Sequence, residues 1–421
     1  MKKVLAQKIL KMMAKATIKR RNPEVVAITG SVGKTTTKEM VGKMLGKFKK
    51  VRFSEKNYNN EIGVPLTIIG GSIEPKRSKI LQAGKIGSAW LFSLLTSKNY
   101  PEVLVLEFGA DHPGDISYLC DFVPISVGIL TDVGISHLEN FGSRENIAKE
   151  KGVLLRSLPP ESLAVYNADN PKVKEVSEKV SANQLSYGFD KECKLRASDV
   201  HYDYKENKKT HELMLNGLGF KLTYQGRLIP VKLDYCVGEG SVYAALAALA
   251  AGLYFDLNLI EMTKELRKTR PCPGRMSFLE GIKSTMIIDD TYNSAPASTL
   301  AALNTLAKLE AQRKIVVMGD MLELGEEEEN AHQEVLKEAF KVDPDAVLLV
   351  GERFKNFSEA LTKKQKERTV FFKNSLKAGR FLQDFIQAGD LVLIKGSRGM
   401  KMEKAVKEIM RYPEKDVIIN A

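Results

Sequence analysis

Short apolar runs alternate with amphipathic stretches along most of the chain, and the first such pair opens with "EVVAITGSVGKTTTKEM" (24–40). Val25 to Ile28 form a β-branched apolar run that predicts a buried strand. Two glycines, Gly30 and Gly33, then allow a tight turn. A helical pattern follows, and its apolar positions are expected to face inward: Met40, Val41, Met44, Leu45 and Phe48.

Three further apolar runs end in polar residues. "VLVLE" ends at Glu107, "ISVGILTDVGISH" continues to His137, and "LAVYNADNP" ends near Asn167 and Asp169. With the strand that ends at Gly30, these runs predict four strands of a parallel sheet. Because the carboxyl ends of parallel strands meet at one edge, and ligands bind there, their polar residues are candidates for one site.

The pattern changes between about 193 and 236, where short alternating pieces predict antiparallel strands within or beside the first domain. "SVYAALAALAAGLYF" then predicts an Ala-rich helix, and "RPCPGRMSFL", with its prolines and glycine, predicts a hinge between domains. After the hinge, strand-like runs alternate with helices. The runs are "TMIIDD", "KIVVMGD", "AVLLVG", "TVFF" and "LVLIKG", and the first helix is expected to start at about Pro296. The acidic "GEEEEN" (325–330) predicts a solvated helix start.

The chain is thus expected to be an α/β protein with three parts. Residues 1–22 form a basic amphipathic helix, residues 23–270 a central parallel-sheet domain, and residues 271–421 a Rossmann-like domain. Lysines interrupt every apolar run of the first segment, which excludes a signal peptide or a membrane span. A helix packed on the domain is favoured there, with a membrane-surface helix as the alternative. "SAWLFSLLTS" (88–97) is apolar but too short to span a bilayer.

Composition adds little to this picture. Of the 421 residues, 43% are hydrophobic and 28% charged, which is ordinary for a globular protein. The net charge of +12 suits nucleic acid, a membrane surface or anionic small molecules. A single Trp and the lack of an aromatic–basic motif argue against nucleic acid. Scattered cysteines without a C-x-x-C pair indicate reduced thiols in a cytoplasm.

The turn after the first strand has the makings of a phosphate cradle. A strand, a glycine loop, Lys34-Thr35 and a helix form the context in which backbone N–H groups wrap a phosphate. The general pattern asks for one more, earlier glycine, so the loop is a shortened variant. Lys34 is placed to reach the β- and γ-phosphates, and Thr35 offers a hydroxyl to Mg²⁺. The predicted nucleotide loop comprises Gly30, Ser31, Val32, Gly33, Lys34, Thr35 and Thr36.

A family resemblance extends over about residues 24 to 410. The chain carries, in order, "TGSVGKTTTKEM", "NYNNEIGVPLTII", "EFGADHPGDI", "GISHLENFGSRENIAKEKG", "YNADNP", "PGRMSFL", "DDTYNSAPAS", "VMGDMLELG" and "KGSRGM". In these strings it resembles the Mur ligases, most closely the MurF type. The resemblance implies a cytoplasmic, ATP-dependent ligase of peptidoglycan precursor synthesis that joins D-Ala-D-Ala to UDP-MurNAc-tripeptide. The substrate carboxylate would take the γ-phosphate as an acyl phosphate, which the amine then displaces.

The same resemblance assigns roles to individual residues. Glu107 and His137 correspond to ligands of a second Mg²⁺ ion, and Lys151 to a lysine that many Mur ligases carry as a carbamate. For Lys151 a helix-surface lysine is the plainer interpretation, and the match of "IAKEKGVLL" after "SHLENFGS" reverses it. Lys149 lies close enough to blur the assignment. Arg275 resembles an arginine that reaches ATP, and Asp290 an acid that binds its ribose. Asn59 and Asn60 match the segment that faces the muramyl peptide, and the amine-substrate positions are Asn293, Lys395, Ser397 and Arg398.

The sequence departs from the family pattern in two places. Only about two dozen residues precede the first strand, where the family carries an N-terminal domain that grips the UDP-sugar. "VGEGSVYAALAA" has Gly240, Ser241 and Ala244 where the family has His and Asn beside the adenine. Two alternatives therefore stay open: a Mur-like amide ligase with a non-UDP or lipid-linked acceptor, and a nucleotide-binding scaffold without ligase activity. A monomer acting on small molecules is expected.

Overall fold

The computed structural model describes residues 2–54, 58–72, 79–96, 100–134, 138–206, 213–357 and 361–413. Its backbone forms two compact units. The first comprises Met1–Asp199, Phe220–Val231 and Val242–Thr269, and the second Val200–Gly219, Lys232–Ser241 and Arg270–Ala421. The expected borders after residues 22 and 270 stay predictions.

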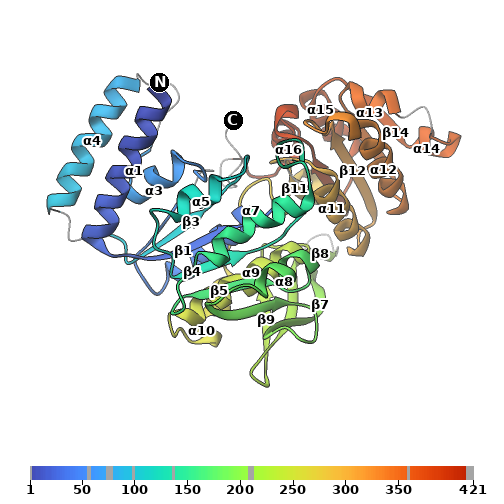
Figure 1. Ribbon diagram of the computed structural model, residues 1–421. Helices are drawn as coiled ribbons and strands as arrows, with labels where there is room; N and C mark the ends of the chain where they lie inside the picture. Colours follow the sequence, from blue (N-terminus) through green and yellow to red (C-terminus); the bar gives the residue numbers. More distant parts are fainter. Residues whose placement is uncertain are drawn as a thin grey trace. The chain divides into compact units, whose positions relative to one another are not determined.

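The larger sheet contains nine strands in the order β2-β3-β1-β4-β5-β6-β7-β8-β9 within the described residues (Figure 1). β1 pairs in parallel with β3 on one side and β4 on the other, and the parallel pairing continues through β5 and β6. The four predicted strands are therefore parallel neighbours with their carboxyl ends at one edge, as expected. The strands are β1 (Glu24–Thr29), β2 (Val51–Phe53), β3 (Val103–Glu107), β4 (Val127–Leu130), β5 (Leu163–Asn167), β6 (Asn183–Gly188), β7 (Leu195–Glu206), β8 (Leu213–Tyr224) and β9 (Arg227–Leu233).

The predicted alternating segment from 193 to 236 consists of three strands that continue this sheet. They are longer than the short pieces expected, and β7 starts parallel to β6 at Leu195 and Arg196. β8 and β9 are joined by Gln225 and Gly226 alone, with φ values of 48° and 75°. Two consecutive left-handed residues make the type I′ turn of an antiparallel hairpin, so the chain reverses direction there.

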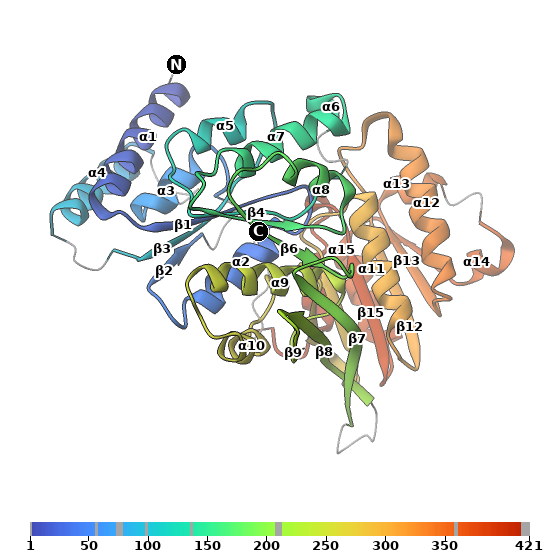
Figure 2. The same cartoon turned by 60° about the horizontal axis from the view of Figure 1, so that its bottom comes forward.

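Helices cover both faces of the larger sheet (Figure 2). α2 begins directly at Lys34, and its apolar side chains are fully buried from Met40 to Leu45. The helix ends at Leu45, so Phe48 lies in the following turn and is only half-buried, which corrects its expected place on the helix. The helices up to residue 270 are α1 (Lys2–Arg21), α2 (Lys34–Leu45), α3 (Gly63–Ile69), α4 (Lys79–Thr96), α5 (Asp115–Cys120), α6 (Leu138–Phe141), α7 (Arg144–Arg156), α8 (Pro171–Ser177), α9 (Glu239–Tyr254) and α10 (Leu259–Arg267).

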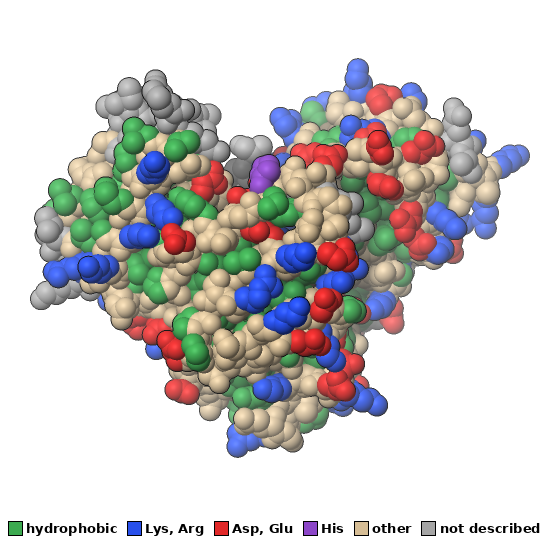
Figure 3. Space-filling model, viewed as in Figure 1, with side chains coloured by type: hydrophobic (Ala, Val, Ile, Leu, Met, Phe, Trp, Pro, Cys, Tyr) green, Lys and Arg blue, Asp and Glu red, His purple; other side chains and the backbone are tan. Residues whose placement is uncertain are grey.

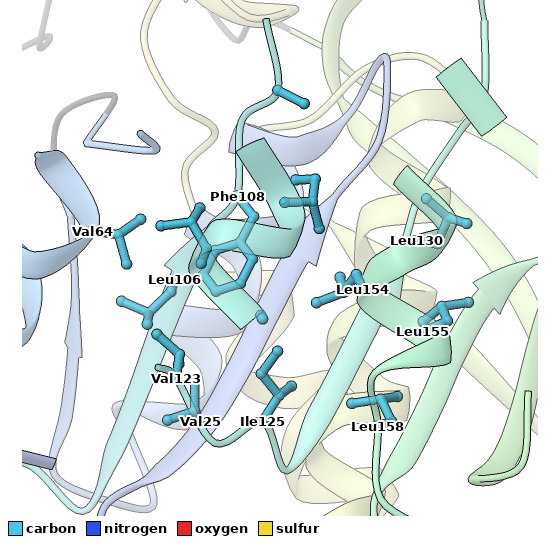
Figure 4. Packing of buried hydrophobic residues seen from close by; sticks show 14 of the residues in the cluster. Val25, Val64, Leu106, Phe108, Val123, Ile125, Leu130, Leu154, Leu155 and Leu158 are labelled. Carbon is cyan, nitrogen blue, oxygen red and sulfur yellow. The ribbon is translucent and has the colours of Figure 1, made fainter. Parts of the chain in front are cut away.

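One apolar cluster holds α7 against the strands that carry the polar edge (Figure 4). Leu154 and Leu155 of α7 pack with Val25 of β1, Leu106 of β3 and Leu130 of β4, all of them fully or almost fully buried. Burying a side chain of this size is worth about 1.5–3 kcal/mol. The position of α7, which carries Lys151, is thereby fixed relative to β1, β3 and β4.

The second unit contains a six-stranded sheet in the order β10-β11-β15-β12-β13-β14 within the described residues. All neighbours are parallel except β10, which runs antiparallel to β11. The predicted parallel-sheet and Rossmann-like fold class is confirmed. The strands are β10 (Ser277–Glu280), β11 (Met286–Asp290), β12 (Arg313–Gly319), β13 (Ala346–Val350), β14 (Thr369–Phe372) and β15 (Asp390–Lys395).

Helices predicted in the second half occur where expected. α11 begins at Pro296, and the acidic run starts with a short 3₁₀ turn, η2 (Gly325–Glu327), followed by α12. The last three residues of the predicted hinge, Ser277, Phe278 and Leu279, pair with β11 as part of β10, and the hinge itself stays a prediction. The remaining elements are η1 (Ile282–Ser284), α11 (Pro296–Lys308), α12 (Glu328–Lys341), α13 (Glu352–Phe357), α14 (Lys363–Glu367), α15 (Ser375–Phe385), η4 (Arg398–Met400) and α16 (Glu403–Ile409).

Over the residues that the structure describes, we find no helix with the length and apolar content needed to cross a bilayer.

Candidate active site

The loop between β1 and α2 has the conformation of a phosphate-binding turn. Gly33 caps α2 with φ 86°, and Gly30 has φ 153°. A Cβ atom built on Gly30 would lie 2.0 Å from Oγ1 of Thr131, so only glycine fits. The first N–H groups of α2 have no acceptor within the helix, and no acidic residue lies in its first turn. This helix start therefore attracts an anion.

Residues after β4 hold the loop in place. Thr131 Oγ1 donates a hydrogen bond to the carbonyl oxygen of Val32 at 2.6 Å, and the Ser31 N–H donates to the carbonyl oxygen of Asp132 at 2.9 Å. The Gly134 N–H donates to Oγ of Ser31, also at 2.9 Å. Three hydrogen bonds from one neighbouring strand end thus fix the shape of the loop.

Lys34 brings a positive charge to the loop. Its Nζ donates to the carbonyl oxygens of Gly30 at 2.5 Å and Ser31 at 3.1 Å, so the side chain curls back over the turn. The next residue, Thr35, is buried, and Thr36 is half-buried. All seven residues of the predicted nucleotide loop lie together at the start of α2.

Glu107 lies beside this loop, because residue 28 of β1 is in register with residue 107 of β3. The carboxylate is only 3% exposed. Its Oε1 accepts a hydrogen bond from Nδ2 of Asn59 at 3.1 Å, whereas Oε2 is buried without a hydrogen-bond partner among the described residues. An unsatisfied buried carboxylate oxygen is costly and calls for a ligand, and a cation is the natural one.

Lys151 on α7 faces the same region. Its side chain is 2% exposed, while Lys149 is exposed, so the geometry separates the two lysines that the sequence could not. Burial, reinforced by the nearby charge of Lys34, lowers the pKa of Lys151 to about 7, against the opposing effect of Glu150, Asp132 and Asp111. A large share of this amine is therefore neutral near pH 7.

Asp132 and Glu150 belong to this region as well. Burial raises the pKa of Asp132, although Nδ2 of Asn170 donates to its Oδ1 at 2.6 Å and Lys34 and Lys151 act in the opposite direction. Glu150 accepts hydrogen bonds from the N–H groups of Gly114 and Ile116, both at 2.8 Å, and so fixes the start of α5.

Asn59 and Asn60 differ in their surroundings. Asn59 contacts Glu107, and its carbonyl oxygen accepts from the Gly109 N–H at 2.7 Å. Oδ1 of Asn60 accepts from the N–H groups of Ile62 and Gly63, which caps the start of α3. His137 lies outside the described residues.

The second unit has its own cluster of polar residues at the carboxyl ends of β11 and β15. Asp290 and Lys395 are register partners on these strands. Nζ of Lys395 donates to Oδ2 of Asp290 at 2.5 Å and to the carbonyl oxygen of Asn293 at 3.0 Å. Both partners of this ion pair are buried, so removing either one would leave an uncompensated charge.

Two arginines flank Tyr292 at this edge. The guanidinium carbon of Arg275 lies 4.0 Å from the centre of the Tyr292 ring, and that of Arg398 lies 5.7 Å from it. Nε of Arg275 is buried and has no hydrogen-bond partner among the described residues. Ser397 supports the turn, because its Oγ donates to the carbonyl oxygen of Ser294 and accepts from the Leu322 N–H. Guanidinium groups suit the recognition of a carboxylate or phosphate.

Comparison with known proteins identifies both parts of the chain. Residues 28–71 and 87–252 match the Mur ligase middle domain, and residues 274–398 match the Mur ligase glutamate ligase domain. The UDP-N-acetylmuramoyl-tripeptide–D-alanyl-D-alanine ligase of Bacillus subtilis is 30% identical over 406 residues, which is 96% of this chain and 79% of that protein. The chain belongs to the Mur ligase family. The ligase of the same name from Haemophilus influenzae is 30% identical over 401 residues, with 94% of this chain and 78% of that protein covered.

Solved Mur ligase structures agree with this assignment. MurF from Thermotoga maritima in complex with ADP superposes with a TM-score of 0.76 at 26% identity, covering 96% of this chain and 83% of that chain. MurF from Acinetobacter baumannii gives the same TM-score and identity and covers 96% of this chain and 80% of that one. The expected family is thus confirmed.

Within this Mur ligase, the predicted site residues form two groups. Those of the first unit gather at the edge formed by β1 and β3: the loop residues 30–36, Asn59, Glu107 and Lys151. Those of the second unit gather at the ends of β11 and β15: Arg275, Asp290, Asn293, Lys395, Ser397 and Arg398. Sequence reasoning missed Thr131, Asp132 and Glu150. For the first two a signal was present, because they lie within the run "ISVGILTDVGISH", whose carboxyl end was expected at the same edge as Glu107.

Proposed function

We propose that this Mur ligase joins D-Ala-D-Ala to UDP-MurNAc-tripeptide at the expense of ATP, as the names of its Bacillus subtilis and Haemophilus influenzae relatives state for those proteins. The observation that carries the proposal is the convergence of a phosphate loop, the half-satisfied Glu107 and the buried Lys151 at one sheet edge. A protein that only bound a nucleotide would need the loop but not the other two.

The reaction would proceed in two displacements. An oxygen of the tripeptide carboxylate attacks the γ-phosphorus of ATP, the bond to the β-phosphate oxygen breaks, and ADP leaves with that electron pair. The amine nitrogen of D-Ala-D-Ala then attacks the acyl carbon, phosphate departs, and the amine gives up a proton. Both steps need neutralised phosphate charge, in-line positioning and exclusion of water.

The phosphates would lie on the N–H groups of residues 30–36, with the Lys34 ammonium at the β- and γ-phosphates. Thr35 would hold one Mg²⁺ ion, and Oε2 of Glu107, which has no hydrogen-bond partner among the described residues, fits a role at the second. Bound Mg²⁺ neutralises phosphate charge and polarises the phosphorus–oxygen bond. We assign two ions, the second held by Glu107, His137 and Lys151.

Lys151 would serve that second ion as a carbamate. The neutral amine, available because burial lowers the pKa of Lys151 to about 7, attacks the carbon of CO₂. The new N–C bond forms, one N–H proton passes to solvent, and an anionic carbamate results. Carbamylation converts the Lys151 side chain from a cation that repels a metal ion into an anion that can bind one.

The cluster of the second unit would serve ATP and the amine substrate. Arg275, whose buried Nε has no hydrogen-bond partner within the described part of the chain, would reach ATP. Asp290 would bind the ribose. Asn293, Lys395, Ser397 and Arg398 would hold D-Ala-D-Ala, and the exposed Arg398 guanidinium suits the carboxylate of that dipeptide. Asn59 and Asn60 would face the muramyl peptide.

We place the reaction in the cytoplasm, catalysed by a monomer that can contact a membrane through α1.

Phosphate release from ATP and Mg²⁺ tests this function, with D-Ala-D-Ala and UDP-MurNAc-tripeptide supplied separately and together. Release that requires both, with an amide product by mass spectrometry, is the expected result. Release with D-Ala-D-Ala and only some other carboxylate would favour the Mur-like ligase with a different acceptor. Measurable ATP binding without release for any acceptor would favour the scaffold and reject the ligase.

A further inference from the structure

Helices α1 and α4 lie side by side in the first unit (Figure 1). Nε1 of Trp90 donates to Oγ1 of Thr17 at 2.9 Å, and one turn further Arg21 donates to the carbonyl oxygen of Leu94 at 3.2 Å. From the first contact to the second, the residue number rises by four on each helix, so α1 and α4 run in the same direction. They form one two-helix surface.

The outward face of α1 is apolar where a surface helix is normally polar. Leu5, Ile9 and Met12 are spaced by four and three residues and therefore share one face, with Leu5 60% and Met12 61% exposed. The opposite face already supplies the core contact, because Met13 and Ile18 are buried. The exposed stripe is thus not needed to hold α1 on its own domain.

α4 repeats this arrangement. It faces the apolar core through Ile86 and Trp90, whereas Leu91 is half-exposed and Phe92 is 69% exposed. An exposed phenylalanine costs hydration free energy in a free protein, and several such side chains on adjacent helices mark an interaction surface. Figure 3 shows hydrophobic and basic side chains together over this part of the molecule.

The charges of the two helices have one sign. Neither the 20 residues of α1 nor the 18 of α4 include an acidic side chain. Lys8, Lys15 and Lys19 are exposed and form a row directly beside the stripe of Leu5, Ile9 and Met12. Among the contacts of the described residues, acids of other elements meet α1 at its far edge and at this lysine row: Glu61 accepts from Gln7 at 2.8 Å, and Asp121 from Lys11 at 2.8 Å, with Lys15 3.8 Å away.

We propose that the α1–α4 face, defined by Leu5, Ile9, Met12, Leu91 and Phe92 with the row Lys8, Lys15 and Lys19, binds the surface of an anionic lipid bilayer. Exposed apolar side chains enter the boundary between headgroups and acyl chains, while adjacent lysines pair with lipid phosphates. A complementary protein would have to present a wholly acidic surface around an apolar centre. An anionic bilayer offers that combination over any area, which is why it is the occupant favoured here.

Co-sedimentation of the full chain with vesicles tests the proposal. The protein should pellet with phosphatidylcholine vesicles that contain phosphatidylglycerol, and pellet much less with phosphatidylcholine alone or at high salt. Replacing Lys8, Lys15 and Lys19 together by Gln should lower binding by about tenfold or more. Replacing Leu91 and Phe92 by Ser should lower it to a similar degree.

Matched control variants distinguish binding through this face from a general effect of net charge or of surface hydrophobicity. Lys363, Lys364 and Lys366 are exposed on α14, and their change to Gln removes the same charge elsewhere. Leu228 and Ile260 are exposed apolar residues of the first unit, and their change to Ser matches the α4 variant. Both controls should pellet like the unchanged protein, and all variants should keep its melting temperature.

Equal pelleting of the α1 variant and its α14 control, or no preference for anionic vesicles, would overturn the proposal. A dimer in light scattering that the Leu91 and Phe92 changes dissociate would also overturn it, in favour of a second copy on this face. The measurement uses no ATP or peptide, so its outcome is independent of the ligase assignment.

Discussion

Nδ2 of Asn59 donates to Oε1 of Glu107 at 3.1 Å, which occupies one oxygen of this buried carboxylate and aims the other, Oε2, away from Asn59. The relationship joins a residue of the predicted muramyl-peptide segment to a predicted metal ligand. The two oxygens of the Glu107 carboxylate therefore have different roles. Oε1 is held by the Asn59 amide, which fixes the orientation of the carboxylate, and Oε2 remains for a cation.

The change Glu107→Gln should lower ligase activity about a hundredfold or more, because it removes the anionic oxygen that would hold Mg²⁺. The melting temperature should stay the same or rise, since an uncompensated buried charge disappears. Mg²⁺ titrations of activity and thermal melts without metal measure the two effects. A variant that melts lower and keeps its Mg²⁺ dependence would show that Glu107 is structural.

The change Asn59→Ala tests orientation by the amide. Activity should fall about 10–100-fold, the usual effect of losing a residue that positions a metal ligand. The Mg²⁺ concentration for half-maximal rate should rise with it, whereas ATP binding without metal should not change. Asn60→Ala is the comparison: it removes the cap of α3 and should cost about 1 kcal/mol of stability instead.

Stability should depend on pH through Lys151. Its pKa is lowered from 10.5 to about 7 by folding, so between these values the unfolded chain binds more protons than the folded one. The free energy of unfolding therefore rises with pH from about 7 toward 10.5, and the cost of the buried ammonium is largest below pH 7. Denaturant unfolding of Lys151→Met, in buffers freed of CO₂, should show a gain that shrinks across this range. A gain that does not vary with pH would contradict the lowered pKa.

The fit of the phosphate loop predicts that Gly30→Ala weakens nucleotide binding at least tenfold and costs about 1–3 kcal/mol of stability, because its Cβ would overlap Oγ1 of Thr131. Adding Thr131→Ala should recover part of the loss. Gly84 of α4 has open space around its Cβ position, so Gly84→Ala should be neutral or slightly stabilising. Isothermal titration with ADP and thermal melts measure these changes. Equal effects of the two glycine changes would argue against a shape-specific loop.

In the second unit, Arg398→Ala should raise the KM for D-Ala-D-Ala about tenfold or more while leaving stability within ~0.5 kcal/mol, because this side chain is exposed. Arg275→Ala should instead raise the KM for ATP. Steady-state kinetics with each substrate varied in turn distinguish the two. A swap of these effects would reverse the roles that we assign to the arginines.

The sequence predicted what depends on local pattern. Apolar runs located β1, β3, β4 and β5, and the glycines and Lys34 located the loop before α2. It could not predict what depends on packing: that Lys151 is buried and Lys149 exposed, or that Asp290 pairs with Lys395 across two strands far apart in sequence. β10 was missed because its residues lie beside prolines, and its strand conformation depends on pairing with β11. Phe48 was misplaced because an apolar period does not mark where a helix ends.

The hydrogen bonds that the phosphate loop makes with Thr131, Asp132 and Gly134 hold it in shape before any nucleotide arrives. The entropy lost in ordering that loop is therefore incurred during folding rather than during binding. Nucleotide affinity then becomes a property of the whole sheet: a core change beneath β4 that lets this strand end fray would weaken ATP binding without touching a single binding residue.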